Sequence, residues 1–261
     1  MSLWFHYLMT EILRFHWLFL LLAAPCVGSF LGVVTARLPA GRSSLRGRSA
    51  CPHCGQVLGP RDLVPLLGWL INRGRCRHCG QALSWAYPAI ELAALAVAAW
   101  SLAVLPGWLA WAGCALGWTL LALAVIDAKH LLLPDTLTLP LVPAGLLVAW
   151  AVEPAKLADH AIGAVAGFVA VAAIGLAYRR LRGREGIGLG DAKLFAAAGA
   201  WVSWTGVASV LLLAAAGGLA GHLLGARLTG RSLEGRELPF GPYIAGALWL
   251  VWLYGPLSLG P

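Results

Sequence analysis

Long apolar runs recur along nearly the whole chain, and they constrain its fold more than any other feature of the sequence. A helix needs about 20 residues to cross the roughly 30 Å hydrocarbon core of a membrane, and these runs approach that length. Only 11% of the residues are charged and 60% are hydrophobic, whereas roughly 25% of residues are charged in soluble globular proteins. The sequence therefore predicts an all-α membrane protein that crosses the bilayer several times.

We predict eight transmembrane helices, which occupy about residues 16–38, 86–105, 108–127, 131–152, 160–178, 189–204, 205–228 and 240–256. The fourth of these segments keeps Pro134, Asp135, Pro140 and Pro143, so we expect protein or water rather than lipid beside it. The N-terminal apolar run has neither a basic leader before it nor a small-residue cleavage site after it. We therefore expect it to be retained as the first span.

Lys and Arg residues are abundant in alternate connecting segments, which indicates the cytoplasmic side of the membrane. The segments on that side carry Arg37, Arg42, Arg46, Arg48, Arg61, Arg73, Arg75, Arg77, Lys129, Arg179, Arg180, Arg182, Arg184, Arg227, Arg231 and Arg236. The opposite side carries Arg14 and Lys156. We therefore expect both termini to lie outside the cytoplasm. The net charge of +8 has the same explanation, so we expect contact with membrane lipid and no nucleic-acid partner.

The polar segment from about 39 to 84 holds two CxxC pairs separated by 21 residues. The four cysteines are Cys51, Cys54, Cys76 and Cys79. Four thiolates at this spacing can form a tetrahedron around Zn²⁺, and Gly55 and Gly80 permit the tight turn after each pair. His53 and His78 lie inside the pairs and are alternative ligands. Two disulfides are the other possibility, but a reducing cytoplasmic location disfavours them.

A loop of this size buries little apolar surface, so bound metal would provide most of its folding free energy. A closed site of four thiolates leaves no position open for water, which argues against zinc as the catalyst. We therefore predict a structural zinc site. The remaining cysteines, Cys26 and Cys114, lie alone in apolar spans, where we expect them to be buried as small hydrophobic residues.

Four acidic residues, Glu91, Asp127, Asp135 and Asp191, lie within or at the edge of predicted spans, where each is costly and a candidate for function. Asp127 ends the third span and Asp191 opens the sixth, so the expected topology puts both at the cytoplasmic membrane face. Two carboxylates that are close together in a restricted dielectric share a proton. One can then activate water while the other protonates the scissile carbonyl or the leaving amine, which predicts an aspartyl protease.

Four further residues are predicted to support this pair. Gly188 and Gly190 flank Leu189 and allow the backbone before Asp191 to approach another chain segment closely. Asp135 follows Pro134 and resembles a polar turn residue or an N-cap. Lys193 lies about 200° around the helix from Asp191, so we expect it to reach lipid phosphates rather than to pair with Asp191. The role of Glu91 stays open.

An ordered set of motifs from Gly28 to Ile244 resembles the bacterial prepilin peptidase family, the GxGD aspartyl proteases of type IV pilus and type II secretion systems. The motifs are Gly28-Ser-Phe-Leu, Arg37-Leu-Pro39, both CxxC pairs, Tyr87-Pro88 with Glu91, Asp127-Ala-Lys-His-Leu-Leu-Leu-Pro-Asp135, Gly188-Leu-Gly-Asp-Ala-Lys193 and Pro239-Phe-Gly-Pro242. Two positions depart from the family pattern. Gly32 stands where the family usually has Asn, and Ala86 stands where it often has Arg.

The resemblance implies that Asp127 and Asp191 are the two catalytic aspartates. It also implies that the enzyme cuts after a Gly at the end of the short basic leader of a prepilin or pseudopilin. Bifunctional members of the family then methylate the new N-terminus with S-adenosylmethionine. The implied location is the bacterial inner membrane, with the active site at the cytoplasmic face.

Two other functions are alternatives to this one. A proton-coupled or ion-coupled transporter would explain carboxylates within the membrane, but not a four-cysteine loop or two aspartates at one membrane face. A zinc-dependent nucleic-acid receptor would explain the arginines of the loop, but the loop carries no recognisable binding motif. The expected organisation is a first span at 1–38, a cytoplasmic zinc-binding loop at 39–85 and a seven-span protease core at 86–261.

Overall fold

The structure, a computed structural model, describes residues 16–183, 188–229 and 238–257. Regular structure in these ranges is helical, with two isolated β-bridges and no β-strand, which confirms the all-α fold class. The chain divides into two compact units, residues 1–122 and 123–261, and the boundary falls within helix α5 (Leu109–His130). The predicted cytoplasmic cations Arg184, Arg231 and Arg236, and Arg14 on the other side, lie outside the described ranges.

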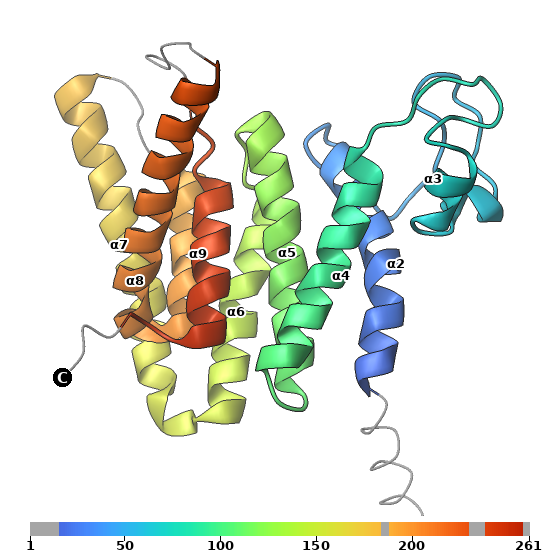
Figure 1. The fold of residues 1–261 in the computed structure, drawn as a ribbon. Helices are drawn as coiled ribbons and strands as arrows, with labels where there is room; N and C mark the ends of the chain where they lie inside the picture. The colour runs from blue at the N-terminus through green and yellow to red at the C-terminus, as the bar shows by residue number, and fades with distance from the viewer. Residues whose placement is uncertain (1–15, 184–187, 230–237, 258–261) are drawn as a thin grey trace, which may run out of the picture. The chain divides into compact units, whose positions relative to one another are not determined.

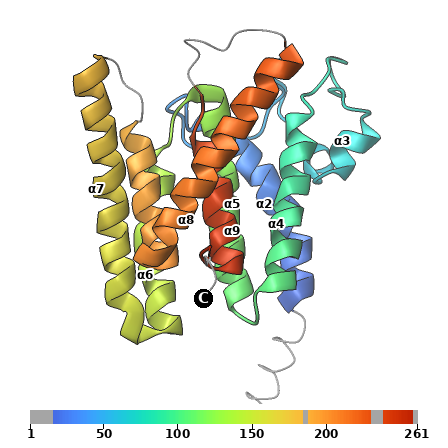
Figure 2. The same cartoon turned by 60° about the vertical axis from the view of Figure 1, so that its left-hand side comes forward.

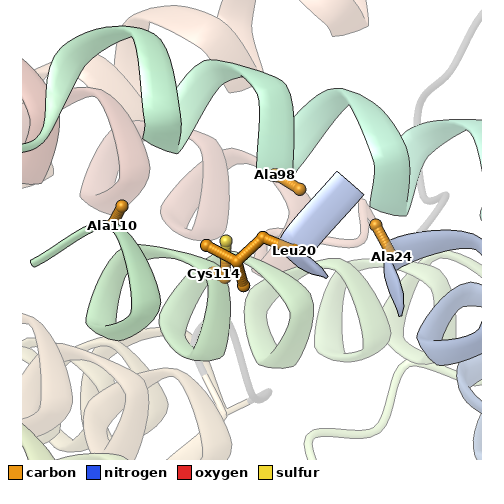
Figure 3. Close-up of a cluster of buried hydrophobic side chains, with 5 residues drawn as sticks. All are labelled: Leu20, Ala24, Ala98, Ala110 and Cys114. Carbon is orange, nitrogen blue, oxygen red and sulfur yellow. The ribbon is translucent and has the colours of Figure 1, made fainter. Parts of the chain in front are cut away.

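In the first unit, α2 (His16–Arg37) lies beside α4 (Ala86–Val104), as Figure 1 shows. A buried cluster joins both helices to the first part of α5, and Figure 3 shows its members, Leu20, Ala24, Ala98, Ala110 and Cys114. Alanine side chains let the helix backbones come close together, as is common where membrane helices pack. Cys114 is buried as predicted, whereas the prediction was wrong for Cys26, which lies on an exposed face of α2.

The polar segment between α2 and α4 folds as a small module that contains a short 3-10 helix, η1 (Pro60–Leu63), and α3 (Leu67–Ile71). Asp62 is the polar centre of this module. Its carboxylate accepts hydrogen bonds from the backbone N–H of Gly59 and the side chain of Asn72, and it forms an ion pair of 3.3 Å with Arg77. Polar contacts of this kind hold a segment that has little apolar core.

The second unit contains α6 (Asp135–Val152), the 3-10 helix η2 (Pro154–Lys156), α7 (Leu157–Arg182), α8 (Leu189–Thr229) and α9 (Gly241–Tyr254). Both α6 and α7 pack on α8, and α9 packs on α8 as well. The indole Nε1 of Trp201 on α8 donates a buried hydrogen bond of 2.8 Å to the carbonyl of Leu141 on α6. This bond fixes α6, which stays helical through Pro140 and Pro143, against its neighbour.

Helix α8 contains a break at Ser203, where φ is 58° and ψ is 178°. Figure 2 shows that α8 changes direction along its course, so its 41 residues make two helical segments. All eight predicted spans therefore correspond to helical segments. Six helices in the described ranges have the length and hydropathy to cross a membrane, α8 being counted once, and α9 is shorter with 14 residues. The number of eight crossings stays a prediction.

We expect Ser203→Gly to stabilise the protein by about 1 kcal/mol, because the backbone of Ser203 occupies a region that glycine adopts without strain and other residues adopt at a cost of about 1–3 kcal/mol. The loss of the hydrogen bond between the Ser203 and Thr205 hydroxyls reduces this gain. The free energy of unfolding in mixed micelles measures the effect. Ser209→Gly, a helical position in the same unit whose hydroxyl accepts the N–H of Leu257, should destabilise instead. Equal destabilisation by both variants would contradict the expectation.

Candidate functional site

The four predicted metal ligands come together in the first unit. The Sγ atoms of Cys51, Cys54, Cys76 and Cys79 all lie within 4.8 Å of one another, and the Cys51 and Cys79 sulfurs are 3.9 Å apart. Four thiolates at Zn–S distances of about 2.3 Å in a tetrahedron have sulfurs about 3.8 Å apart, so the cluster fits Zn²⁺. The cysteines are free of disulfides, and His53 and His78 are exposed and outside the cluster.

The two CxxC pairs form nearly identical turns. In the first turn, Cys51 donates its N–H to Gln56 and accepts the N–H of Gly55 on its carbonyl. In the second, Cys76 donates to Gln81 and accepts from Gly80. Gly55 and Gly80 have φ of 70° and 71°, which confirms the predicted need for glycine after each pair.

Backbone N–H groups within each turn point at the sulfurs and favour the thiolates. Hydrogen bonds from the backbone of Cys54 and His53 lower the pKa of Cys51 to about 7. Those from Cys79 and His78 lower the pKa of Cys76. The backbone N–H of Gln81 also lowers the pKa of Cys79. Desolvation and the neighbouring sulfurs together have the larger, opposite effect, and the pKa of Cys79 is raised to about 11. Bound Zn²⁺ would offset the effect of the neighbouring sulfurs on Cys79, because its positive charge favours the thiolate form of all four cysteines.

The two predicted catalytic carboxylates lie in the second unit. Asp127 is only 6% exposed and its Oδ2 accepts the N–H of Gly241, the first residue of α9, at 2.8 Å. Asp127 was predicted to end the third span, and helix α5 continues for about one more turn beyond it to His130. The helix stops where Leu131 adopts a positive φ of 52°.

Asp191 lies in the first turn of α8, and its Oδ2 accepts the N–H of Gly188 at 3.2 Å. Asp127 is close enough to interact electrostatically with Asp191. The structure therefore brings together two carboxylates that are 64 residues apart in the sequence, since 191 − 127 = 64. Each has one oxygen bound by a backbone N–H, and the other oxygen has no hydrogen bond within the described ranges.

We expect Gly241→Ala to reduce the activity of this carboxylate pair about 10-fold to 100-fold, because a Cβ atom at Gly241 would lie 2.7 Å from Oδ2 and 2.9 Å from Cγ of Asp127. The added methyl group must displace the carboxylate or the start of α9. Gly246→Ala on the same helix is the matched control, since a Cβ atom there meets nothing within 4 Å. Hydrolysis of a substrate peptide measures the effect, and equal rates for both variants would count against a role for Gly241.

The glycines before Asp191 have different surroundings. A Cβ atom at Gly190 would lie 3.1 Å from the Cβ of Leu133, so glycine lets the start of α8 approach the segment between α5 and α6 closely. At Gly188 a Cβ atom would make only ordinary contacts, the nearest at 3.7 Å to Asp191. Gly188 instead contributes its backbone N–H.

Lys193 forms an ion pair of 2.6 Å with Asp135, the first residue of α6. The prediction that Lys193 does not pair with Asp191 agrees with this contact, but its partner is a carboxylate rather than a lipid phosphate. Asp135 is not an N-cap, because Pro134 occupies that position and no side chain caps the helix. The ion pair connects the starts of α6 and α8, and Asp191 lies two residues before Lys193 on α8.

Comparison with known proteins finds relatives that share one name and one family. Residues 22–105 match the bacterial peptidase A24 N-terminal domain, and residues 114–224 match the type IV leader peptidase family. The chain is 42% identical to a prepilin leader peptidase/N-methyltransferase of Dickeya chrysanthemi, over 89% of this chain and 91% of that protein. It is 41% identical to one of Aeromonas hydrophila, over 80% and 72% of the two chains. For one of Pseudomonas aeruginosa the identity is 36%, over 88% and 87%.

This chain belongs to the type IV leader peptidase family. No solved structure matches it. Membership agrees with the resemblance that the motifs carry. Together with the six apolar helices of the described ranges, it identifies a multi-pass membrane peptidase of the inner membrane. The comparisons give no support to the transporter alternative.

The first unit of this leader peptidase also holds a pocket of about 570 Å³, lined by α2, α4 and the cysteine module. Arg42, Arg48 and Arg75 line it, and their side chains have no partner in the described part of the chain. The indole Nε1 of Trp69, also in its wall, is buried without a hydrogen-bond partner in that part. Gly32, one of the two departures from the family pattern, lines the same pocket.

Two residues of the site escaped the sequence analysis. Gly241 was noticed only as part of a family motif, and nothing in its surroundings shows that it meets Asp127, 114 residues away in the chain. Leu66, whose N–H binds Glu91 at 2.7 Å, has no sequence signal at all. Carboxylates and cysteines can be found in a sequence by their residue type. A backbone N–H donor cannot, because nearly every residue has one.

Proposed function

We propose that this chain is a membrane aspartyl endopeptidase that removes the short leader from type IV prepilins or pseudopilins and then methylates the new N-terminus. The pairing of Asp127 with Asp191 is the observation that carries the peptidase part. The chain's relatives are named prepilin leader peptidase/N-methyltransferase, which supports both parts.

The proposed peptidase chemistry uses Asp127 and Asp191 with one shared proton. The ionised carboxylate activates a water molecule for attack on the scissile carbonyl, and the protonated one donates to the carbonyl oxygen or the leaving amine. The N–H groups of Gly241 and Gly188 each hold one oxygen of a carboxylate. This leaves one oxygen of each aspartate for water and substrate.

Supporting roles are proposed for Gly188, Gly190, Lys193 and Asp135. Gly188 orients Asp191 through its N–H, and Gly190 lets α8 start close to Leu133. The Lys193–Asp135 ion pair holds the starts of α6 and α8 together, so it acts on the distance between the carboxylates through the backbone. None of these side chains needs to touch the substrate.

We propose that Cys51, Cys54, Cys76 and Cys79 hold one structural Zn²⁺, which keeps the 39–85 segment folded as a separate zinc-binding domain. The proposed first span is 1–38 and the proposed protease core is 86–261. The cation distribution supports a cytoplasmic position for this domain and for the aspartates. Membrane lipid is the proposed surrounding of the spans, and no nucleic-acid partner is proposed.

S-adenosylmethionine is the proposed methyl donor, and the pocket of the first unit is its proposed site. The pocket volume of about 570 Å³ falls within the roughly 300–1,000 Å³ of small-molecule sites. Arg42, Arg48 and Arg75 can bind the donor's carboxylate, and the Trp69 N–H can donate to it. When bound, the donor supplies the methyl group, and the chain's own residues bind and orient it.

Mass spectrometry of a processed substrate tests the proposal, because it reports the cleavage site and methylation together. Purified protein in detergent is incubated with a synthetic prepilin and S-adenosylmethionine. We expect release of the leader after its terminal Gly, and one methyl group on the mature N-terminus. An intact substrate after long incubation with folded, zinc-loaded protein would reject the peptidase assignment. A cleaved but unmethylated product would reject the methyltransferase part alone.

A further inference from the structure

Glu91 is a buried carboxylate to which the proposed peptidase chemistry gives no role. It lies in the first half of the apolar helix α4 and is only 7% exposed. An acidic residue at such a position is costly and is a functional candidate by default. Its Oε2 accepts the N–H of Leu66 at 2.7 Å, and the side chain of Ser29 also forms a hydrogen bond with it.

The backbone around Leu66 holds this carboxylate in one orientation. Leu66 has φ of 61° and ψ of −53°, and Leu67 donates its N–H to the carbonyl of Pro65 at 2.6 Å. This is a γ-turn with positive φ, which is rare and strained for a residue with a side chain. Strained turns persist where the surrounding structure requires them, often at ligand sites. On the other side, Gly28 of α2 lies against the backbone of Glu91.

Glu91 and Leu66 both line the pocket proposed for the methyl donor. The other charged or titratable side chains that line it are Arg37, Arg42, Arg48, Cys51, Asp62, Arg75, Cys76, Arg77 and Tyr87. The part of α5 in the same unit, residues 109–122, carries no charged side chain.

Three of these charged side chains, Arg37, Asp62 and Arg77, have partners. Arg37 donates to the carbonyls of Arg46 and Arg48, at 2.9 and 3.1 Å, and Asp62 pairs with Arg77. Within the described ranges, Glu91 is therefore the pocket carboxylate that has no cationic partner. Its Oε2 is held by the backbone, and its orientation is fixed before a ligand arrives.

We propose that Glu91 takes the proton from the new N-terminal ammonium of the cleaved substrate, so that the free amine can accept the methyl group. This inference rests on the proposed methyltransferase function. An α-amino group has a pKa of about 7.7–8.0, so at neutral pH most of it is protonated and has no lone pair for attack. The positive charge of Arg42, Arg48 and Arg75 disfavours the ammonium and favours its loss of a proton.

Glu91 accepts one proton from nitrogen, and the nitrogen lone pair then forms a bond to the methyl carbon of the sulfonium donor. The carbon–sulfur bond breaks with its electron pair left on sulfur, which becomes a neutral thioether. The product is a singly methylated, positively charged secondary ammonium, and Glu91 returns its proton to water.

Glu91→Gln is the decisive variant, because the glutamine carbonyl can still accept the Leu66 N–H while it cannot accept a proton from the ammonium. We expect methyl transfer at pH 7 to fall about 10²-fold to 10⁴-fold, the range for loss of a general base. The deficit should shrink steadily toward pH 9, where the amine is already neutral. Zinc content and cleavage of the same substrate show that the variant is folded. Glu153→Gln, at an exposed glutamate paired with Lys156, is the matched control.

A binding measurement separates recognition of the amine from catalysis. A peptide with the mature substrate N-terminus should bind the protein about 10-fold more tightly at pH 7 than its N-acetylated form, and Glu91→Gln should abolish that preference. Should Glu91→Gln lose zinc, Glu91→Asp replaces it, with reduced transfer and an unchanged pH profile expected.

Normal methyl transfer by a folded Glu91→Gln variant at pH 7 would overturn the inference. A deficit equal at every pH would overturn it as well, since that result describes a purely structural residue. Absence of both methyl transfer and S-adenosylhomocysteine binding in the unaltered protein would instead reject the proposed methyltransferase function.

Discussion

Asp127→Asn and Asp191→Asn are each expected to reduce leader cleavage about 10²-fold to 10⁴-fold, to near the background rate. Asparagine has nearly the shape of aspartate and can still accept the N–H of Gly241 or Gly188, so the fold should be kept. It cannot share a proton with the remaining carboxylate. The rate of release of the leader from a synthetic prepilin measures the effect.

The control for both variants is Asp159→Asn, an acidic residue in the first turn of α7 in the same unit, which should cleave normally. The unaltered protein should also lose activity as pH rises, because the pair then loses the proton that its acid member must donate. A well-folded Asp191→Asn variant with near-normal cleavage would sink the assignment of the catalytic pair.

Cys51→Ser is expected to lower the zinc content from about one ion per chain to almost none. Structural zinc contributes about 10–16 kcal/mol in zinc-finger peptides, and a module with so little core depends on it. Elemental analysis measures the metal, and limited proteolysis between residues 39 and 84 should become much faster. We expect leader cleavage to survive in part, because the aspartates lie on other segments.

Cys26→Ser provides the matched control, because it makes the same substitution at a cysteine outside the cluster. It should keep the zinc and the proteolytic resistance of the unaltered protein. Freshly purified, reduced protein that contains no metal would refute the zinc assignment, and so would a Cys51→Ser variant that retains it.

The fold could be predicted from sequence where local physical constraints decide it. Apolar runs of membrane-spanning length gave the helices, and the two CxxC pairs with Gly55 and Gly80 gave the turns of the cysteine module. The exact end of α5 at His130 could not be read from sequence, because the positive φ of Leu131 that ends the helix has no signal in that residue type. The exposure of Cys26 depends on which face of α2 meets its neighbours, and the low amphipathicity of an apolar helix does not reveal that.

The candidate site could be predicted only in its side chains. Asp127 and Asp191 were expected to meet because topology puts both helix ends at one membrane face, and they fall in one compact unit. The partner of Lys193 was not predicted, because pairing with Asp135 depends on how α6 and α8 pack. The N–H donors of Gly241 and Leu66 also depend on packing between segments that are distant in sequence.

The cysteine cluster has an inner and an outer half. Cys51 and Cys76, the first cysteine of each turn, are buried, whereas Cys54 and Cys79 are exposed. A chelator or an oxidant in solution therefore meets the second cysteine of each turn first, and it would open the coordination of a bound Zn²⁺ from that edge while the first cysteines still hold the ion. Metal exchange at this site should accordingly proceed through a two-thiolate state without prior unfolding, and its rate should rise with chelator concentration.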